Sequence, residues 1–452
     1  MNSSFNVQPM LGKFWQKSFS IHSGIFLGLC CSLFGIQSAQ AASFSFTKIA
    51  DNQNSLLTGY NYWNGAINDQ GTVAFYAGSG GGEGGIFKGQ GKKISTIFNQ
   101  DILADFYPNP YPPDAVQARY FIYPSVDIND QNIVAFAGRV SLEYGLGNGQ
   151  AIFIADDKNK IKMVTGFGPS GRFEGGALVD LNLNNQNSLT SRIVAGGAFL
   201  SPTDTITLYN NITQSNQSST TVAIASITNA PTGGLIDLGS PSLNNQGTVA
   251  FSALFRDIHA EYPLPPITSQ LIMMQKGGFQ TVVTNNIKWP SQPVVNDNNE
   301  IAFLSSNYDL FSGDEIESGI FTFKNGNLTK AVNNQGLFGS FESLDINNKG
   351  NIAFSATLDT GTKGIFIGAD PVADKVITVG DSLFGSTITN LSFFADKGLN
   401  DQGQIAFYAA LEDGRTGIFR ADPAKKSVPE PTSVLGLLAL GVWGLSSRRK
   451  SG

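Results

Sequence analysis

The chain repeats one short segment seven times. Each copy begins with Asn followed by Asp or Asn and continues into a strand-like run, as in Asn68–Phe75 and Asn244–Phe251. The seven copies start at Asn68, Asn129, Asn184, Asn244, Asn296, Asn347 and Asn400. The starting asparagines lie 61, 55, 60, 52, 51 and 53 residues apart. A period of this size is typical of a propeller or a solenoid.

The fourth residue of every copy is Gly or Asn, the residues that enter positive-φ conformations at least cost. These positions are Gly71, Asn132, Asn187, Gly247, Asn299, Gly350 and Gly403. Short Asx side chains at the first two positions can bond to nearby backbone amides and set up a turn. We therefore predict that each copy is a tight, structural hairpin turn that launches a strand.

Ala-Phe follows the turn in six copies, from Ala74-Phe75 to Ala406-Phe407. Because side chains alternate along a strand, the large ring and the small residue lie on opposite faces. In a propeller each sheet packs face to face with the next, so this pairing permits interdigitation. We predict that these phenylalanines form the core between blades and not a binding stripe.

Each period supplies about four short strands, which matches a propeller blade. A low share of charged residues (14%) and abundant Gly (51) and Phe (33) also favour an all-β fold. The strand at 44–49 has no preceding motif, and the last copy lacks following strands. We predict a seven-bladed β-propeller whose last blade is shared between N- and C-terminal strands. The copy at Asn184 leaves the count open by one, because Ser188–Arg192 is expected to delay its strand.

Residues 1–41 have the three parts of a secretory signal. Lys13 and Lys17 precede an apolar run of twelve residues, which is followed by Ala39-Gln40-Ala41. We predict cleavage by signal peptidase after Ala41. The alternative, a membrane helix, needs roughly 20 apolar residues. Both cysteines lie in this segment, so the mature chain would contain neither disulfides nor thiolate metal sites.

Residues 428–450 contain Pro429-Glu430-Pro431, an apolar stretch from Ser433 to Leu445, and the basic end Arg448-Arg449-Lys450. This order resembles the PEP-CTERM sorting signal. The resemblance implies processing by an exosortase-type enzyme at the surface or extracellular matrix of a Gram-negative bacterium that makes exopolysaccharide. It also implies a short hydrophobic membrane helix, transient or retained. The alternative is a plain C-terminal membrane anchor.

The segment between the signals, residues 42–427, is the predicted propeller domain. It contains 24 basic and 34 acidic residues, a net charge of −10. Because phosphate binding needs concentrated positive charge, this balance argues against a nucleic-acid partner. The repeats resemble propeller-like regions of other PEP-CTERM proteins whose activities are mostly unassigned, which implies a fold and no reaction.

Few residues of the propeller domain suggest catalysis, and we predict no catalytic or metal-binding residue. His259 would be the only histidine left in the mature chain, which excludes a multi-histidine metal centre. With Arg256 and Tyr262 it could abstract a proton from a uronic acid, as polysaccharide lyases do. The Asx oxygens of the turns are hard ligands, so calcium at the turns is an alternative to a purely structural role.

The segment Asp105–Pro124 combines proline with aromatic residues. Its tyrosines, Tyr107, Tyr111, Tyr120 and Tyr123, either stack on sugar rings or a protein partner, or pack over the propeller rim. The sequence thus favours an exported, non-enzymatic binding or structural protein, associated with polysaccharide or another cell-envelope component. The alternative is a secreted carbohydrate-active enzyme, lyase-like, that uses the His259 loop.

Overall fold

The computed structural model describes residues 43–60, 62–79, 84–99, 102, 118–142, 148–166, 176–195, 203–226, 235–256, 267–276, 278–283, 290–305, 318–334 and 337–424. All described residues lie in one compact unit, residues 41–452. Every named element in the described ranges is a β-strand. The all-β prediction is confirmed.

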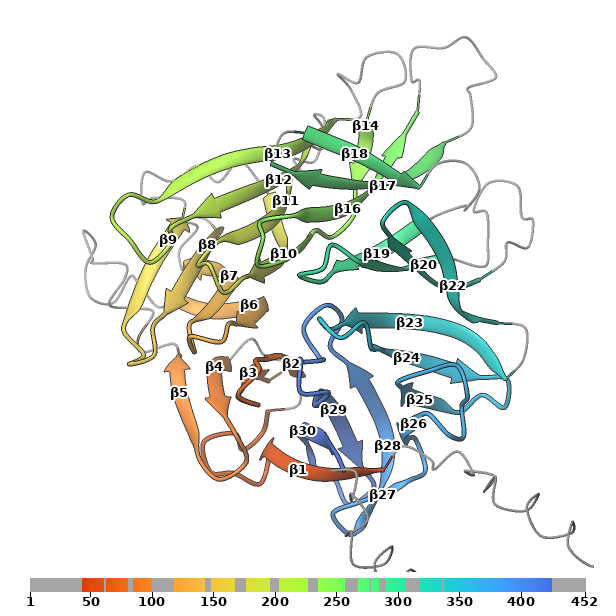
Figure 1. Ribbon diagram of the computed structural model, residues 1–452. Helices are drawn as coiled ribbons and strands as arrows, with labels where there is room; N and C mark the ends of the chain where they lie inside the picture. Colours follow the sequence, from red (N-terminus) through yellow and green to blue (C-terminus); the bar gives the residue numbers. More distant parts are fainter. Residues whose placement is uncertain are drawn as a thin grey trace, which may run out of the picture. The chain divides into compact units, whose positions relative to one another are not determined.

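The strands form seven antiparallel sheets, and each sheet is one blade of a ring (Figure 1). Blade 1 contains β2 (Tyr62–Ile67), β3 (Val73–Gly78), β4 (Gly84–Gly89) and β5 (Ile94–Phe98). Blade 2 contains β6 (Ala118–Ile128), β7 (Val134–Leu142), β8 (Asn148–Ala155) and β9 (Ile161–Gly166). Blade 3 contains β10 (Gly176–Leu183), β11 (Leu189–Ala195), β12 (Thr203–Asn210) and β13 (Ser218–Ser226).

The remaining blades follow the same order along the chain. Blade 4 contains β14 (Leu235–Leu238), β15 (Ser242–Leu243), β16 (Val249–Phe255), β17 (Thr268–Gln275) and β18 (Gly278–Val283). Blade 5 contains β19 (Pro290–Val295), β20 (Ile301–Ser305), β21 (Gly319–Lys324) and β22 (Asn327–Asn333). Blade 6 contains β23 (Phe338–Ile346), β24 (Ile352–Leu358), β25 (Lys363–Phe366) and β26 (Lys375–Thr378).

Blade 7 is built from both ends of the described chain. It contains β27 (Ser382–Leu383), β28 (Ser386–Phe393), β29 (Ile405–Leu411), β30 (Thr416–Pro423) and β1 (Phe44–Asp51). β1 pairs with β30 from Phe44 opposite Pro423 to Asp51 opposite Gly417. Seven blades and a shared last blade are as predicted from the sequence.

The cores lie between the blades. At five of the seven seams, the Ala of one blade and the Phe of the next belong to one buried cluster, as for Ala74 with Phe136 and Ala406 with Phe75. The Phe side chains of the repeats are 0–1% exposed. Replacing such a ring by Ala typically costs about 3–5 kcal/mol of stability, so these positions hold neighbouring blades together.

The fourth residue of every turn has positive φ, between 55° and 80°. Its backbone N–H donates to the carbonyl of the first Asn, as from Gly71 to Asn68 at 2.9 Å. The local turn chemistry expected from the sequence is therefore present in all seven copies.

The prediction that the strand after Asn184 is delayed was wrong. β11 begins at Leu189, five residues after the Asn, as β3 begins five residues after Asn68. Thr190 and Ser191 occupy the Ala and Phe positions and are fully buried. The copy looked irregular because its core residues are polar, while its backbone register is the same as in the others.

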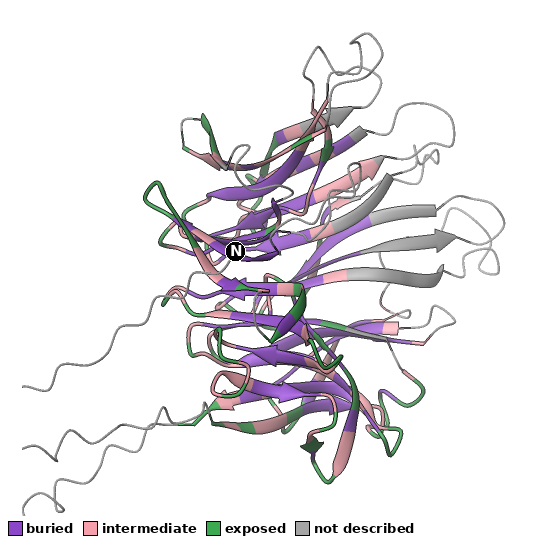
Figure 2. Ribbon diagram, turned by 90° about the vertical axis from the view of Figure 1, so that its right-hand side faces the viewer, coloured by how far each residue is buried: buried purple, intermediate pink, exposed green. Residues whose placement is uncertain are grey.

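The seven Asx turns lie on one face of the ring, which we call the turn face. Both ends of the described chain leave at this face, where the Ala424 N–H donates to the Ser43 carbonyl at 2.8 Å. Gln404, in the turn of blade 7, contacts Asp422 at the end of β30. β5 ends and β6 begins on the opposite face, as do the facing ends of β16 and β17. The described parts of the strands are largely buried (Figure 2).

Candidate functional site

Seven asparagines form a closed ring of hydrogen bonds on the turn face. The side-chain Nδ2 of the first Asn in each turn donates to the backbone carbonyl of the first Asn in the next, at 2.8–3.1 Å. The last bond runs from Asn400 of blade 7 to Asn68 of blade 1. The Oδ1 of each Asn also accepts the N–H four residues on in its own turn. Each amide thus serves its own blade and the next.

The second residue of each turn forms another closed ring. Its backbone N–H donates to the Oδ1 of the corresponding residue in the next blade, at 2.6–2.8 Å. The seven residues are Asp69, Asp130, Asn185, Asn245, Asp297, Asn348 and Asp401. Amide N–H groups also lie between some carboxylates, since Asn348 donates to Asp297 at 2.8 Å and to Asp401 at 2.7 Å.

Three consecutive members of this second ring are carboxylates. Asp69 lies between Asp401 and Asp130, and burial together with these two charges raises the pKa of Asp69 to about 6. The backbone N–H of Asp401, which donates to Asp69, opposes the shift. Repulsion between neighbouring carboxylates is therefore concentrated where blades 7, 1 and 2 meet.

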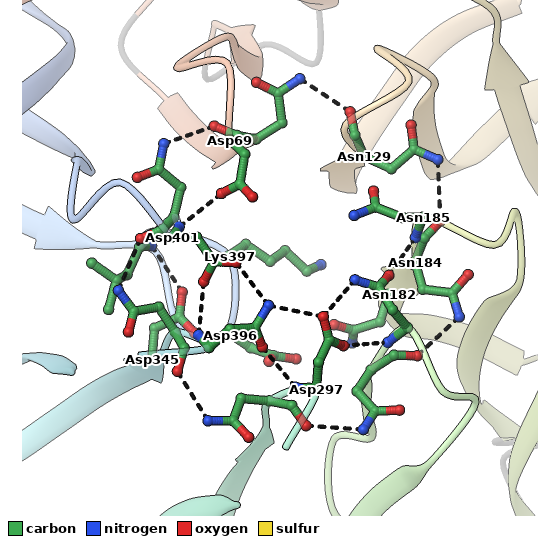
Figure 3. Close-up of a pocket in the computed structure, with 18 of the residues that line it drawn as sticks. Asp69, Asn129, Asn182, Asn184, Asn185, Asp297, Asp345, Asp396, Lys397 and Asp401 are labelled. Atoms are coloured by element: carbon green, nitrogen blue, oxygen red, sulfur yellow. Dashed lines mark hydrogen bonds between the residues drawn. The ribbon is translucent and has the colours of Figure 1, made fainter. Parts of the chain in front are cut away.

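A pocket of about 170 Å³ lies where the rings meet and is lined by residues of all seven blades (Figure 3). One short segment, Phe394–Gly398, crosses it, and we call this the axial segment. The Lys397 ammonium donates to the Leu181 carbonyl of blade 3 and to the Ser125 hydroxyl of blade 2 at 3.2 Å. Its own carbonyl accepts from Ile67 of blade 1 at 2.9 Å.

Asp396 extends these contacts to two further blades. Its N–H donates to the Leu344 carbonyl of blade 6 at 3.0 Å, and its carboxyl accepts from the Ser242 hydroxyl of blade 4 at 2.8 Å. Its φ of 59° is in the left-handed region, where non-glycine residues are uncommon. The axial segment thus connects blade 7 to five other blades across the axis.

The acids beside the axial segment are deeply buried. Burial raises the pKa of Asp345 to about 8, against three backbone N–H groups that favour its charged form. Burial and then the neighbouring Asp345 raise the pKa of Asp396 well above its usual range. Burial raises the pKa of Asp127 to about 6, and the Lys397 charge limits that shift. At neutral pH the axis therefore holds Asp345 in its protonated form, with the Lys397 ammonium close to Asp127.

A second, larger cavity of about 830 Å³ lies at the seam between blades 3 and 4 on the turn face. We call it the amide cavity, because Asn and Gln side chains supply most of its polar lining. Leu208 and Met274 add apolar surface, and Lys276 adds a positive charge. No Asp or Glu is among the described residues that line it. Such a cavity can pair donors and acceptors with a polar, uncharged or anionic ligand.

The first Asn of every predicted turn lines the axial pocket, whereas the fourth residue of each turn is not among the described residues that line it. Most of the other predicted site residues fall outside the described residues. These are His259, Tyr107, Tyr111, the cleavage residues Ala39 and Ala41, and the sorting residues Pro429, Glu430, Pro431, Arg448 and Arg449. Tyr120 and Tyr123 lie in β6, where only the backbone is described. Their predicted roles stay predictions.

Within the described ranges, no cluster of three or more His, Cys, Asp or Glu could hold a metal ion. The turn oxygens considered for calcium accept hydrogen bonds: the first Asn accepts within its turn, and the second residue accepts from its neighbour blade. Calcium at the turns stays a prediction. A search of the described residues for a helix long and apolar enough to cross a membrane found none.

The fold and the axial rings define a seven-bladed propeller closed by Asx turns. The chain belongs to a family of unknown function (DUF7453), whose sequence model matches residues 109–364 and 381–435. Residues 427–450 match the PEP-CTERM protein-sorting motif. The motif marks an exported protein that is anchored or processed at the cell envelope by an exosortase-type enzyme. No curated protein sequence matches the chain significantly.

Solved structures that resemble the chain do so at low identity. An acylaminoacyl peptidase of Pyrococcus horikoshii is 8% identical with a TM-score of 0.49, over 85% of this chain and 55% of that one. A PL25 ulvan lyase is 8% identical with a TM-score of 0.42, over 86% and 97%. A Trypanosoma rangeli sialidase is 9% identical with a TM-score of 0.36, over 71% and 56%. The chain spans about half the length of the peptidases.

Proposed function

We propose that this protein is a non-enzymatic binding protein of the bacterial surface or extracellular matrix that associates with exopolysaccharide through its propeller. The observation that carries the proposal is the amide cavity. Its volume, about 830 Å³, lies within the usual range for small-ligand sites, roughly 300–1,000 Å³. Sugar hydroxyls both donate and accept, as amide side chains do.

The proposed route to the surface fits the order of the strands. Cleavage after Ala41 leaves β1 intact, because β1 begins at Phe44. At the other end, β30 ends at Pro423, six residues before Pro429 of the sorting signature. Removal of either signal therefore leaves all seven blades complete, and the sorting tail follows the propeller directly.

The direct test is a glycan array probed with residues 42–427, which contain every described strand. Binding would be scored with and without calcium, and released unsaturated sugars would be measured in parallel. We expect retained ligand without product. Release of unsaturated product would contradict the proposal and favour a carbohydrate-active enzyme, with His259→Ala as the next variant. Binding that requires calcium would assign the ion a role in ligand capture.

A further inference from the structure

The amide cavity lies at a seam that lacks an interblade link made at seams where the fourth turn residue is Asn. Where the fourth turn residue is Asn, its side chain bonds to the preceding blade. Asn187 donates to Gln131 at 3.2 Å, and Asn299 donates to Gln246 at 3.0 Å. The first Asn of the preceding turn also reaches it, as Asn129 reaches Asn187 at 3.1 Å. These amides close the seams before blades 3 and 5.

At the seam before blade 4 the fourth residue is Gly247, which has no side chain to make this link. A Cβ placed on Gly247 would meet no atom within 4 Å. The three other glycines of the repeat have close neighbours: Arg420 and Gln404 beside Gly71, Glu300 beside Gly350, and Pro423 beside Gly403. Of the four turn glycines, Gly247 is therefore the one with open space beside it.

Because Gly247 has no side chain, the Gln186 side chain of blade 3 lacks the partner that its counterparts have. In blades 2 and 4 the third turn residue donates to the next blade, Gln131 to Asn185 at 2.8 Å and Gln246 to Asp297 at 2.6 Å. No hydrogen bond joins the side chain of Gln186, their counterpart in blade 3, to another described residue. It lines the amide cavity with its donor and acceptor free.

The remaining lining chemistry fits a sugar ring that carries one negative charge. Asn210 and Gln275 supply further amides, Leu208 and Met274 present apolar atoms to the C–H face of a ring, and Lys276 is exposed at the edge. An ammonium favours a carboxylate because charge-assisted hydrogen bonds are about twice as strong as neutral ones. No carboxylate among the described lining residues opposes this preference.

We propose that the amide cavity binds a short oligosaccharide that contains a uronic acid, with Gln186 holding hydroxyls and Lys276 holding the carboxylate. This inference rests on the proposed function and deepens it, because it names the site and the sugar class. The absence of a side chain at Gly247 is what admits the ligand.

The test restores the missing side chain. Asn adopts the required positive φ at three equivalent turns, so Gly247→Asn is expected to fold, to bond to Gln186 and to narrow the cavity beside that residue. We expect at least about tenfold weaker binding of trigalacturonate by calorimetry, equivalent to about 1.4 kcal/mol. Gly350→Asn, the same change at the seam where Glu300 lies, is the matched control and keeps wild-type affinity.

Lys276→Gln tests the charge without altering the seam. It should bring the preference for trigalacturonate over neutral galactotriose down by about fivefold while neutral binding stays unchanged. If wild-type protein binds the neutral sugar as tightly, the uronate assignment is overturned. If Gly247→Asn binds as wild type does, the site is wrong although the proposed function stands. If wild-type protein binds no glycan in the array, the proposed function fails as well.

Discussion

At the residue scale, the turn sequence distinguishes two kinds of hydrogen bond. The first position is Asn in all seven copies, and its side chain must donate to the next blade as well as accept in its own. The second position is Asp in four copies and Asn in three, and there an acceptor alone suffices. The turn conformation could be predicted because it is local. The sequence also indicates that the first side chain must donate, because no copy has Asp there. The acceptor of that bond could not be predicted, since it lies more than fifty residues away along the chain.

The turn of blade 7 allows this distinction to be tested. Asn400→Ala removes the side-chain acceptor of the Gln404 N–H and the donor to the Asn68 carbonyl, which keeps only its bond from Gly71. We expect a loss of about 3 kcal/mol in the free energy of unfolding, measured by urea denaturation. Asn400→Asp keeps the acceptor and should still destabilise. Gln402→Ala, an exposed change in the same turn, should cost less than about 0.5 kcal/mol. An Asp variant as stable as wild type would show that the interblade donor contributes nothing.

At the element scale, the axial segment was not predictable from the sequence. Phe394–Gly398 reads as a short link before the last motif, and only the closed ring places Lys397 opposite Leu181 and Ser125. The burial of Asp127 and Asp345 at the axis was not predictable either, because in the sequence they look like the polar residues of an alternating strand. Their counterparts in the other blades are Ala66, Asn182, Ser242, Val294 and Gly398, so no repeated residue type signals a buried position.

The buried axis makes stability depend on pH. The pKa of Asp345 is about 8 in the folded protein against 3.8 for an unperturbed carboxyl, so the folded state holds the proton more tightly. The resulting stabilisation is complete below about pH 4 and is lost as the pH rises through 8. We expect the free energy of unfolding in urea to fall between pH 5 and pH 9.

The matched variants identify the group that causes this fall. Asp345→Asn should make it smaller, whereas Asp413→Asn, an exposed carboxyl in the loop before β30, should leave it unchanged. Stability that rises over the same range would contradict the protonated axis.

At the scale of the whole molecule, the sequence predicted closure by simple counting. Seven motifs, one incomplete blade at each end and the strand at 44–49 together required a shared seventh blade, and β1 pairs with β30 accordingly. The amide cavity was not predictable, because it depends on what surrounds Gly247 in space. The four turn glycines are equivalent in sequence and differ only in their neighbours.

Deletion of residues 43–51 tests how far folding depends on closure. It removes β1, exposes the edge of β30 and uncovers the cluster that contains Ile49 and Ala50. Because an open sheet edge can pair with another chain, we expect oligomers by size-exclusion chromatography and a lower melting temperature. Deletion of residues 425–452, beyond the last strand, should leave a monomer with wild-type stability. A monomeric, equally stable β1 deletion would show that six complete blades hold the ring unaided.

The position of β30 has a mechanical consequence. The sorting tail continues from a strand that is flanked on both sides, by β29 and by β1. A pull on an attached tail, for example from flow over a cell, therefore loads an interior strand and must slide it past two neighbours together. An edge strand would instead peel away one hydrogen bond at a time. Because β1 pairs with the outer side of β30, the strand that leads into the sorting tail is hydrogen-bonded on both sides and resists such a pull.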